Sequence, residues 1–491
     1  MHNKDWIAQW ALYSPEHTAL KEYETGRSLT YQELNAQANY LAQRFIEKAG
    51  LQPGDRLMIM SEQCLELVGL FSMAQKTGIV LVPVNYRLAP SEINYMISDA
   101  RPSLLIAEQK FADKLKQLKT DTSITWLEDL QQELENTSEA HFKSQSIPDE
   151  HPLFILYTSG TTGFPKGAIY THKMLFWNSI NTTLSLSLSA EDLTINCAPT
   201  FHTGGWNVLL SPLLHRGGTV GLLKKFDADR VLQLMEADQC KVFFGVPTML
   251  KMMAESAAFA TVDLSQLRYF IVGGEALPLE VIRTWHDRGV KIRQGYGLTE
   301  VGPNLTSLHQ DDAETKIGSI GRPNFYVEYK LVGEEHKPVA TGQIGEFCLK
   351  GPMVTPGYWH NQEATDKALV DGWFHTGDLV REDEQGYLYV VDRKKSMFIS
   401  GGENVYPAEV ERVIRQLSTV NEAAVIGVPD EQWGEVGKAF VSMKNGAAFE
   451  ADELRQHCLQ HLAKYKVPKH WVMLIELPKN DSGKLDRKQL K

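Results

Sequence analysis

The sequence predicts an α/β fold: a large N-terminal domain of parallel or mixed sheets with covering helices and a β-rich lobe, then a small mobile α+β C-terminal domain. Strand and helix signals alternate from residue 30 to residue 288, which is typical of a parallel sheet with helices on its faces. From about residue 318 the pattern changes to short strands with Gly and Pro turns. Because 491 residues exceed one ordinary core, we expect more than one domain.

The first alternating elements begin at Thr30. Residues Thr30 to Glu33 resemble a capping box, and apolar residues at steps of four, three and four then predict a helix that ends near Gly50. The pattern next predicts helices over 65–76 and 91–98 and strands over 56–60, 78–84 and 103–107. Residues 108–151 are polar apart from 127–134, and we expect them at the periphery.

The alternation continues into the second half of the chain. Further strands are expected over 153–157, 193–198, 242–244 and 269–272, and further helices over 172–184, 249–253 and 281–288. The last hundred residues predict helices over 408–417 and 453–462 and strands over 423–428, 439–443 and 471–477. We place the N-terminal domain at 1–391 and the C-terminal domain at 392–491, with the charged segment 391–395 as a hinge candidate.

Composition excludes several classes of protein. Hydrophobic residues make up 43% and charged residues 23%, as in soluble globular proteins, and no apolar run has the length of a membrane span. The N-terminus lacks a signal-peptide pattern, so a cytoplasmic location is expected. The net charge of −11 argues against nucleic-acid binding. The five cysteines are far apart and odd in number, which argues against disulfides or a zinc site and favours buried packing residues.

A segment rich in glycine and hydroxyl residues, Tyr157 to Gly167, follows the apolar run 153–157. Glycines allow backbone N–H groups to approach phosphate oxygens, hydroxyl groups add donors, and Lys166 adds a cation. It is not a Walker loop, since Gly167 stands where a hydroxyl residue would follow the lysine. The pattern predicts a nucleotide phosphate loop, and a Ser/Thr/Gly-rich surface turn is the alternative.

Two further motifs combine glycine with a carboxylate. In Gln294 to Glu300, an aromatic face at Tyr296 suits an adenine, and Thr299 and Glu300 suit a phosphate oxygen and Mg²⁺. The segment 371–378 ends at Asp378, whose carboxylate can accept hydrogen bonds from both ribose hydroxyls. Each motif alone has a simpler alternative, a glycine turn for the first and a capping aspartate for the second.

The basic C-terminal part holds two glycine-bearing loops, 401–407 and 480–484. Lys484 follows Ser-Gly and has the mobility that an incoming catalytic cation needs. A solvated terminal lysine is the alternative.

Five motifs stand in one order along the chain: 157–167, 295–300, 373–378, 392–396 with 401–407, and 482–485. Together they resemble the acyl-adenylate-forming superfamily of AMP-binding enzymes, most closely the fatty-acyl-CoA synthetases, from Thr30 to Lys488. The resemblance implies an ATP-dependent, Mg²⁺-dependent, AMP-forming carboxylate–CoA ligase. Acid and ATP would give acyl-AMP and pyrophosphate, and the thiol of coenzyme A would then give acyl-CoA and AMP, both at one active site.

The resemblance also implies a role for each motif residue, from ATP binding to the approach of the thiol. The ATP phosphates would be wrapped by Thr158, Ser159, Gly160, Thr161, Thr162, Gly163 and Lys166. Adenine would contact Gly274, Glu275, Ala276 and Tyr296, the α-phosphate Thr299, Mg²⁺ Glu300, and the ribose Asp378 and Arg393. Lys484 would bridge the acid carboxylate and the α-phosphate, Asp392 would be the pivot of the C-terminal domain, and Gly401, Gly402 and Glu403 would line the CoA channel.

The resemblance also implies that the acid pocket lies around His202, Trp206 and Gly297. His202 would orient the carboxylate or pack beside it, and Trp206 is either a gate to an acyl tunnel or a core aromatic. No acidic residue lies between Phe201 and His215, which argues against an α-amino acid.

We expect a medium- or long-chain fatty acid as the substrate, with an aromatic acid, including o-succinylbenzoate, as the alternative. A non-catalytic nucleotide-binding regulator and a luciferase-type oxidase stay open. So do peripheral membrane contact and the choice between a monomer and a homodimer.

Overall fold

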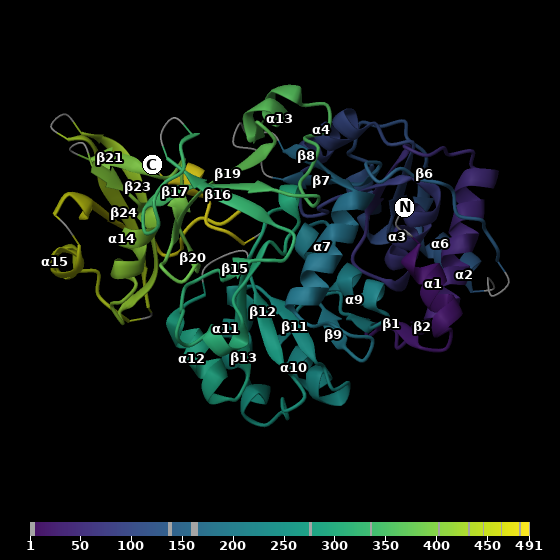
Figure 1. The fold of residues 1–491 in the computed structure, drawn as a ribbon, viewed down its shortest axis with the longest axis horizontal. Helices are drawn as coiled ribbons and strands as arrows, with labels where there is room; N and C mark the ends of the chain where they lie inside the picture. The colour runs from purple at the N-terminus through teal and green to yellow at the C-terminus, as the bar shows by residue number, and fades with distance from the viewer. Residues whose placement is uncertain are drawn as a thin grey trace. The chain divides into compact units, whose positions relative to one another are not determined.

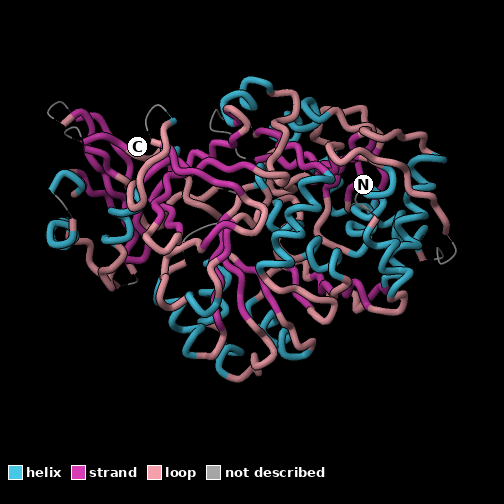
Figure 2. Tube along the Cα trace, viewed as in Figure 1, coloured by secondary structure: helices cyan, strands magenta, loops and turns pink. Residues whose placement is uncertain are grey.

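The computed structural model describes residues 5–135, 140–158, 165–273, 277–333, 336–400, 403–430, 433–444, 446–462, 464–480 and 483–490. The chain forms two compact units, each of which mixes helices and strands (Figure 1, Figure 2). The first unit is Met1–Tyr329 with Leu349–Phe374, and the second is Lys330–Cys348 with His375–Lys491. The predicted domain boundary at 391/392 falls inside strand β20 (Leu388–Arg393) and stays a prediction.

A six-stranded sheet forms one part of the first unit, in the order β6-β5-β3-β4-β7-β8. Its strands are β3 (Arg56–Met60), β4 (Val80–Pro83), β5 (Leu104–Ala107), β6 (Ile124–Trp126), β7 (Pro152–Thr158) and β8 (Lys166–Thr171). All neighbours are parallel except β7 and β8, which are antiparallel. The strands predicted over 56–60, 78–84, 103–107 and 153–157 are confirmed, whereas β8 was not predicted.

Among the described residues, four helices connect the parallel strands, as the alternation predicted: α3 (Leu65–Thr77), α4 (Pro90–Ala100), α5 (Ala112–Leu115) and α6 (Leu127–Leu134). The helices α1 (Trp6–Tyr13) and α2 (Tyr31–Ala42) precede β3. The predicted capping box begins α2: the Glu33 amide donates to Thr30 Oγ1 over 3.2 Å, and the Thr30 amide donates to Glu33 Oε2 over 2.7 Å. The stripe Leu34, Ala38, Leu41 and Phe45 is fully buried, so both the helix and its core face are confirmed.

Two further sheets complete the first unit. One has the order β2-β1-β10-β9 and the other the order β11-β12-β13-β14-β15. The first comprises β1 (Thr18–Glu22), β2 (Ser28–Thr30), β9 (Leu193–Asn196) and β10 (Thr219–Leu222). The second comprises β11 (Val242–Gly245), β12 (Tyr269–Val272), β13 (Lys291–Tyr296), β14 (Thr306–Ser307) and β15 (Arg322–Pro323). Their helices are α7 (His172–Ser185), α8 (Thr203–Asn207), α9 (Leu210–Arg216), α10 (Ala228–Ala237), α11 (Pro247–Ala254) and α12 (Leu279–Asp287).

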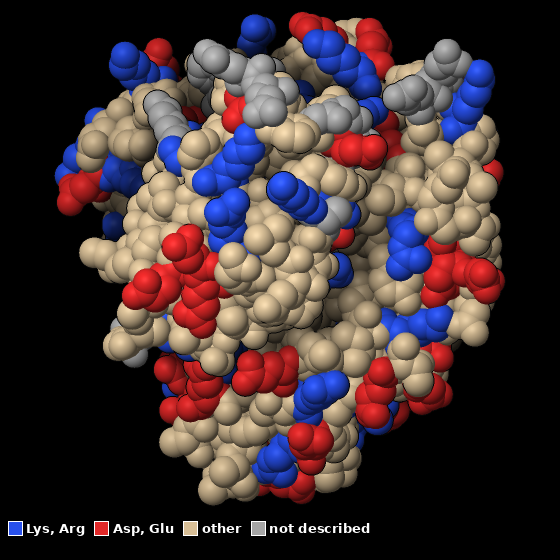
Figure 3. Space-filling model, turned by 90° about the vertical axis from the view of Figure 1, so that its left-hand side faces the viewer, with Lys and Arg blue, Asp and Glu red and all other residues tan. Residues whose placement is uncertain are grey.

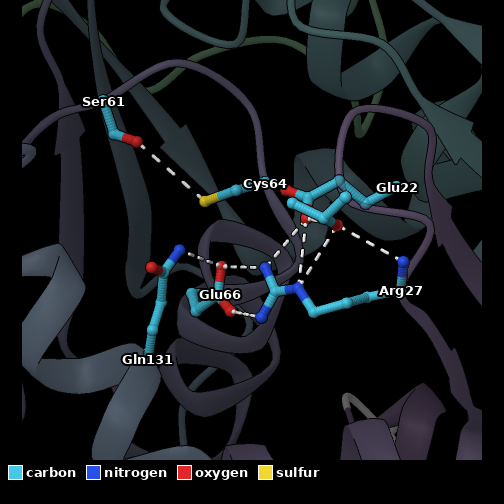
Figure 4. A network of polar contacts seen from close by, with 7 residues as sticks. Glu22, Arg27, Ser61, Cys64, Glu66 and Gln131 are labelled. Atoms are coloured by element: carbon cyan, nitrogen blue, oxygen red, sulfur yellow. Dashed lines mark hydrogen bonds and ion pairs between the residues drawn. The ribbon is translucent and has the colours of Figure 1, made fainter.

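A buried ion-pair network ties β1 to α3 (Figure 4). The Arg27 guanidinium lies 2.8 Å from Glu22 Oε2 and 2.7 Å from Glu66 Oε1, and both glutamate side chains are 1% exposed. Gln131 from α6 donates to Glu66 Oε2 over 3.2 Å. Burial alone would raise the pKa of Glu66, but the hydrogen bond and charge of Arg27 outweigh it and lower the pKa. Arg27 therefore keeps the buried carboxylate of Glu66 ionised at neutral pH.

The β-rich lobe begins with a strand at Glu328, after the change of pattern predicted from about residue 318. It forms a sheet in the order β16-β17-β19-β18, and β20 also pairs with β19. The strands are β16 (Glu328–Val332), β17 (Ile344–Lys350), β18 (Leu369–Val370) and β19 (Trp373–Glu382), with helix α13 (Gln362–Ala368) before β18.

The C-terminal α+β part has a sheet in the order β22-β21-β24-β23, with β25 on β24. Its strands are β21 (Phe398–Ser400), β22 (Glu403–Val405), β23 (Val420–Asp430), β24 (Gly434–Met443) and β25 (His470–Met473), and its helices are α14 (Pro407–Ile414) and α15 (Ala451–His461). Apolar residues from both helices and from the sheet form one core, so this part buries its own hydrophobic surface. The predicted fold class, α/β with a separate α+β C-terminal domain, is confirmed.

Surface and cysteine features agree with the composition. All five cysteines are buried and free, as predicted, and burial raises the pKa of the Cys197 and Cys240 thiols to about 12. Basic and acidic side chains are interspersed on the face that Figure 3 draws. Among the described residues, no helix is long and apolar enough to cross a membrane.

Candidate active site

The predicted phosphate loop connects β7 to β8, two antiparallel strands of a hairpin. Thr158 is the last residue of β7 and Lys166 the first of β8, and these two positions pair across the hairpin. Ser159, Gly160, Thr161, Thr162 and Gly163 lie outside the described residues. Thr158 is brought to Glu300: its Oγ1 lies 3.5 Å from Glu300 Oε1. The first and second motifs therefore meet at one place, as the resemblance implied.

Tyr358 lies beside Glu300 and Lys166, although the sequence analysis did not identify it as a site residue. Its hydroxyl donates to Glu300 Oε1 over 2.9 Å, and the Lys166 ammonium lies 5.3 Å from the centre of its ring. Burial, followed by the charge and hydrogen bond of Glu300, raises the pKa of Tyr358 well above its ordinary value. The phenol therefore stays protonated and acts as a donor to the carboxylate.

The backbone around Tyr358 is fixed on both sides. The Thr355 amide donates to the Glu300 carbonyl over 2.7 Å, and the Trp359 amide donates to the Gly167 carbonyl over 2.7 Å. Gly357 has φ 142°, and a Cβ there would lie 2.5 Å from Thr365 Cγ2, so the turn requires glycine. In the sequence, Gly357 marks a turn before two aromatic residues, but no pattern links this segment to Glu300.

The expected adenine side lies at the end of β13. Tyr296 is the last residue of that strand and pairs with Thr306 of β14. A Cβ at Gly297 would lie 2.1 Å from the Pro303 carbonyl oxygen, so only glycine allows this close approach. Thr299 then opens a short 3₁₀ turn, Thr299–Val301, which carries Glu300. Gly274, Glu275 and Ala276 lie outside the described residues.

The oxygen donors at this place fit a Mg²⁺ ion. Glu300 supplies one carboxylate, and the Thr158 hydroxyl lies beside it. Among the described residues no cluster of three or more His, Cys, Asp or Glu side chains could hold a metal. A single protein carboxylate with substrate phosphates is nevertheless the usual environment of Mg²⁺ in nucleotide-binding enzymes.

The expected acid loop follows β9 and enters α8. His202 is partly exposed and lies beside the Phe201 ring, with 4.7 Å between ring centres. Trp206 is fully buried, and its ring lies 5.3 Å from those of Phe71 and Phe154. In this conformation Trp206 therefore packs in the core, and its burial lends no support to a gate.

In the second unit, the structure brings Asp378 and Arg393 together. Arg393 Nε lies 2.5 Å from Asp378 Oδ1, because β19 and β20 pair these two positions. Asp378 is 3% exposed, so the arginine holds a buried carboxylate. Glu346 supports the same strand end: it accepts from the Gly377 amide over 3.2 Å and from Lys394 Nζ over 2.9 Å.

Asp392, the expected pivot, is a buried residue of the paired strand β20. Its carboxylate accepts from the Arg393 amide over 2.6 Å and from the Ala408 amide, in the first turn of α14, over 2.8 Å. It thus caps this helix from a distant strand. Burial raises its pKa even though both hydrogen bonds act in the opposite direction. A rotation about Asp392 would have to break the strand pairing, and the pivot role stays a prediction.

The remaining predicted residues lie on the C-terminal loops. Lys484 is exposed and lies in a loop outside the strands. Its backbone amide donates to Asn480 Oδ1 over 3.0 Å. Glu403 is an exposed residue at the start of β22. Gly401 and Gly402 lie outside the described residues.

A hairpin loop rich in glycine and hydroxyl residues beside the Glu300 carboxylate, together with a separate α+β domain, is typical of the class of adenylate-forming enzymes. The chain belongs to the family of AMP-binding enzymes, because the model named AMP-binding enzyme matches residues 7–359 and the model named AMP-binding enzyme C-terminal domain matches residues 409–484. It is an acid–thiol ligase, an acyl-CoA synthetase of that family.

Several relatives match along their full length. Feruloyl-CoA synthase of Amycolatopsis sp is 38% identical over 486 residues, covering 98% of this chain and 96% of the relative. Indoleacetate–CoA ligase of Aromatoleum aromaticum is 35% identical, covering 99% and 96%. Long-chain-fatty-acid–CoA ligase FadD13 of Mycobacterium tuberculosis is 34% identical, covering 99% and 97%. The structure of the Bacillus subtilis o-succinylbenzoate CoA synthetase with ATP and magnesium ion is 29% identical, with a TM-score of 0.89 and coverage of 99% of both chains.

Proposed function

We propose that this AMP-forming acid–CoA ligase activates an apolar carboxylic acid that carries an aromatic ring. The observation that carries the proposal is that the relatives at 38% and 35% identity are named for feruloyl and indoleacetate substrates. The acid loop supports it: no acidic residue lies between Phe201 and His215, and a Cβ at Gly204 would lie 3.3 Å from the Phe244 ring. Aromatic side chains at such a loop suit a ring-bearing acid through edge and offset stacking.

The residues divide the first half-reaction among them. The loop between Thr158 and Lys166 holds the leaving pyrophosphate, and Lys484 stabilises the negative charge that develops when the carboxylate attacks the α-phosphate. Mg²⁺, when bound, neutralises phosphate charge beside Glu300. Tyr358 keeps the Glu300 carboxylate oriented, and the Asp378–Arg393 pair binds the ribose hydroxyls.

The second half-reaction uses the C-terminal loop at 401–403. This loop lines the approach of the CoA thiol, which attacks the acyl carbonyl and releases AMP. His202, which lies beside Phe201, orients the acyl group in both half-reactions. ATP, Mg²⁺ and coenzyme A are thus the proposed small-molecule partners.

A medium- or long-chain fatty acid is the second candidate, and it is the one that the sequence alone favoured. The relative FadD13 supports it, with 34% identity along the whole chain. Trp206, the residue that suggested an acyl tunnel, is fully buried and lends this candidate no support.

The test is pyrophosphate release and thioester formation with a panel of acids, with and without CoA. The panel contains ferulate, indoleacetate, o-succinylbenzoate and straight-chain acids from hexanoate to palmitate. We expect the highest kcat/KM with a ring-bearing acid. A straight-chain acid that exceeds all ring-bearing acids would replace the first candidate by the second.

A further inference from the structure

A row of aromatic rings leads from the carboxyl ends of two interior strands of the six-stranded sheet, β5 and β4, to His202. Phe111 stacks on Tyr86 with 5.0 Å between ring centres and 23° between planes. Tyr86 meets Phe201 edge to face at 5.3 Å and 89°. Phe201 in turn lies 4.7 Å from the His202 ring. These rings come from three separate loops of the first unit and follow strands β5, β4 and β9.

The far end of the row is fixed by an ion-pair cluster. Lys110 Nζ lies 2.6 Å from Glu62 Oε2, 2.9 Å from Glu108 Oε2 and 5.0 Å from the centre of the Phe111 ring. The Glu62 amide donates to Glu108 Oε1 over 2.5 Å, which ties the loops after β3 and β5 to each other. Phe111 is therefore attached to the ends of two neighbouring strands.

The loop of Tyr86 is fixed in a second way. Lys114 Nζ donates to the Tyr86 carbonyl over 2.6 Å and to the Leu88 carbonyl over 2.8 Å, and the Leu88 amide closes a turn on the Asn85 carbonyl. The Arg87 guanidinium covers the Tyr86 and Phe201 rings at 5.8 and 5.7 Å. A tyrosine whose backbone carbonyl is hydrogen-bonded and whose ring contacts both an aromatic ring and a guanidinium has little rotamer freedom.

The backbone of the acid loop is held separately. Asn196 Nδ2 donates to the Gly205 carbonyl over 3.0 Å, and the His202 amide donates to the Pro199 carbonyl over 3.2 Å. These bonds fix the path of the chain. The side chains of Phe201 and His202 make the further contacts of the row, because the Phe201 ring lies edge to face with Tyr86 on one side and beside the His202 ring on the other.

We propose that Tyr86 is a positioning residue for the acid site: it fixes the Phe201 ring and, through Phe201, the orientation of His202. The inference rests on the proposed role of His202 in orienting the acyl group. It requires the ring of Tyr86 but not its hydroxyl, because the contact with Phe201 is edge to face.

The test is a double-mutant cycle of Tyr86→Leu with His202→Ala, in which kcat and KM are measured for the acid and for ATP. The acid is the one with the highest rate in the panel, so an error in the proposed acid class leaves this test intact. Tyr86→Leu should lower kcat/KM for the acid about threefold to tenfold, the effect of one edge-to-face aromatic pair, with KM for ATP changed less than about twofold. Tyr86→Phe should behave as the wild type. With His202→Ala already present, Tyr86→Leu should add less than about a further twofold loss.

Equal effects of Tyr86→Leu in the two backgrounds would overturn the proposal, as would a parallel rise in KM for ATP. An unchanged kcat/KM for the acid in His202→Ala would also overturn the proposal, since His202 would then have no part in orienting the acid. Phe111→Leu carries the same test if Tyr86→Leu does not fold, with a smaller effect on the acid alone. Tyr40→Leu, which removes a partly buried tyrosine ring elsewhere in the first unit, is the matched control and should leave kcat/KM unchanged.

Discussion

The Tyr358 hydroxyl donates to Glu300 Oε1 over 2.9 Å, although the two residues are 58 positions apart in the chain. The Lys166 ammonium lies 5.3 Å from the centre of the Tyr358 ring. The backbone amide of the next residue, Trp359, donates a hydrogen bond to the Gly167 carbonyl. Tyr358 therefore couples the carboxylate proposed for Mg²⁺ to the base of the phosphate-loop hairpin. A rigid donor of this kind restricts the orientation of a metal-binding carboxylate, and this leads to the first prediction.

Replacing Tyr358 by Phe should raise the Mg²⁺ concentration needed for half-maximal pyrophosphate release. The expected increase is about tenfold, because residues that orient metal ligands typically contribute ten- to a hundredfold to metal affinity or activity. The measurement is a Mg²⁺ titration at saturating acid and ATP. Tyr389→Phe is the control, since that hydroxyl contacts Asp383 on a hairpin of the second unit. An unchanged Mg²⁺ dependence in Tyr358→Phe would show that the hydrogen bond does not support a metal ligand.

Replacing Lys484 by Ala should abolish most adenylate formation, by about a hundredfold or more, because it removes the cation proposed to stabilise the transition-state charge. Conversion of supplied acyl-AMP and CoA to the thioester should persist. Both half-reactions are measured separately, by pyrophosphate release and by thioester formation. Lys479→Ala is the control: this lysine lies five positions earlier and pairs with Glu422 at 2.8 Å. Equal losses in both half-reactions would contradict the division of roles.

The local features of the fold could be predicted from the sequence where short-range chemistry decides them. The capping box at Thr30 and the strands at 56–60 and 269–272 agree with the structure, because caps and buried apolar runs are local signals. Strand β8 was missed, since its apolar residues are few and its partner is an antiparallel strand beyond a polar loop.

The meeting of distant residues could be predicted only in part. The motif order indicated that Thr158 and Glu300 belong to one site, but no sequence pattern indicates that Tyr358 completes it. The burial of Trp206 could not be predicted either, because an aromatic residue at a helix start suits a pocket wall and a core alike. Only its contacts with Phe71 and Phe154 place it in the core.

Replacing Asp392 by Ala should lower the free energy of unfolding by about 1–2 kcal/mol, because it removes the carboxylate that caps α14 through Ala408. Because Asp392 is also the predicted pivot, we expect thioester formation to slow more than adenylate formation, measured with thermal unfolding alongside. Glu382→Ala at the end of β19 is a control on the same hairpin. Equal slowing of both half-reactions would contradict the pivot role and leave Asp392 as a helix cap alone.

Replacing Arg27 by Met should destabilise the protein, because it leaves the carboxylates of Glu22 and Glu66 buried without a cation. Breaking a buried pair is strongly destabilising, and since Arg27 itself is 39% exposed we expect roughly 2–4 kcal/mol at pH 7. Lys116→Met, which removes an exposed ion pair with Asp113, should leave the free energy of unfolding almost unchanged.

The pH dependence of the Arg27 variant gives the sharper result. In the wild type the pKa of Glu66 lies below its ordinary value, so its stabilising contribution is present above the unfolded-state pKa of about 4.3 and is lost as the pH falls through the lower folded-state pKa. Without Arg27, burial dominates and raises the pKa of Glu66, so acidification relieves the buried charge. The difference in unfolding temperature between wild type and Arg27→Met, measured by calorimetry at pH 7 and pH 4.5, should therefore shrink at the lower pH. A difference that stays constant or grows would mean that Arg27 acts by packing rather than by charge.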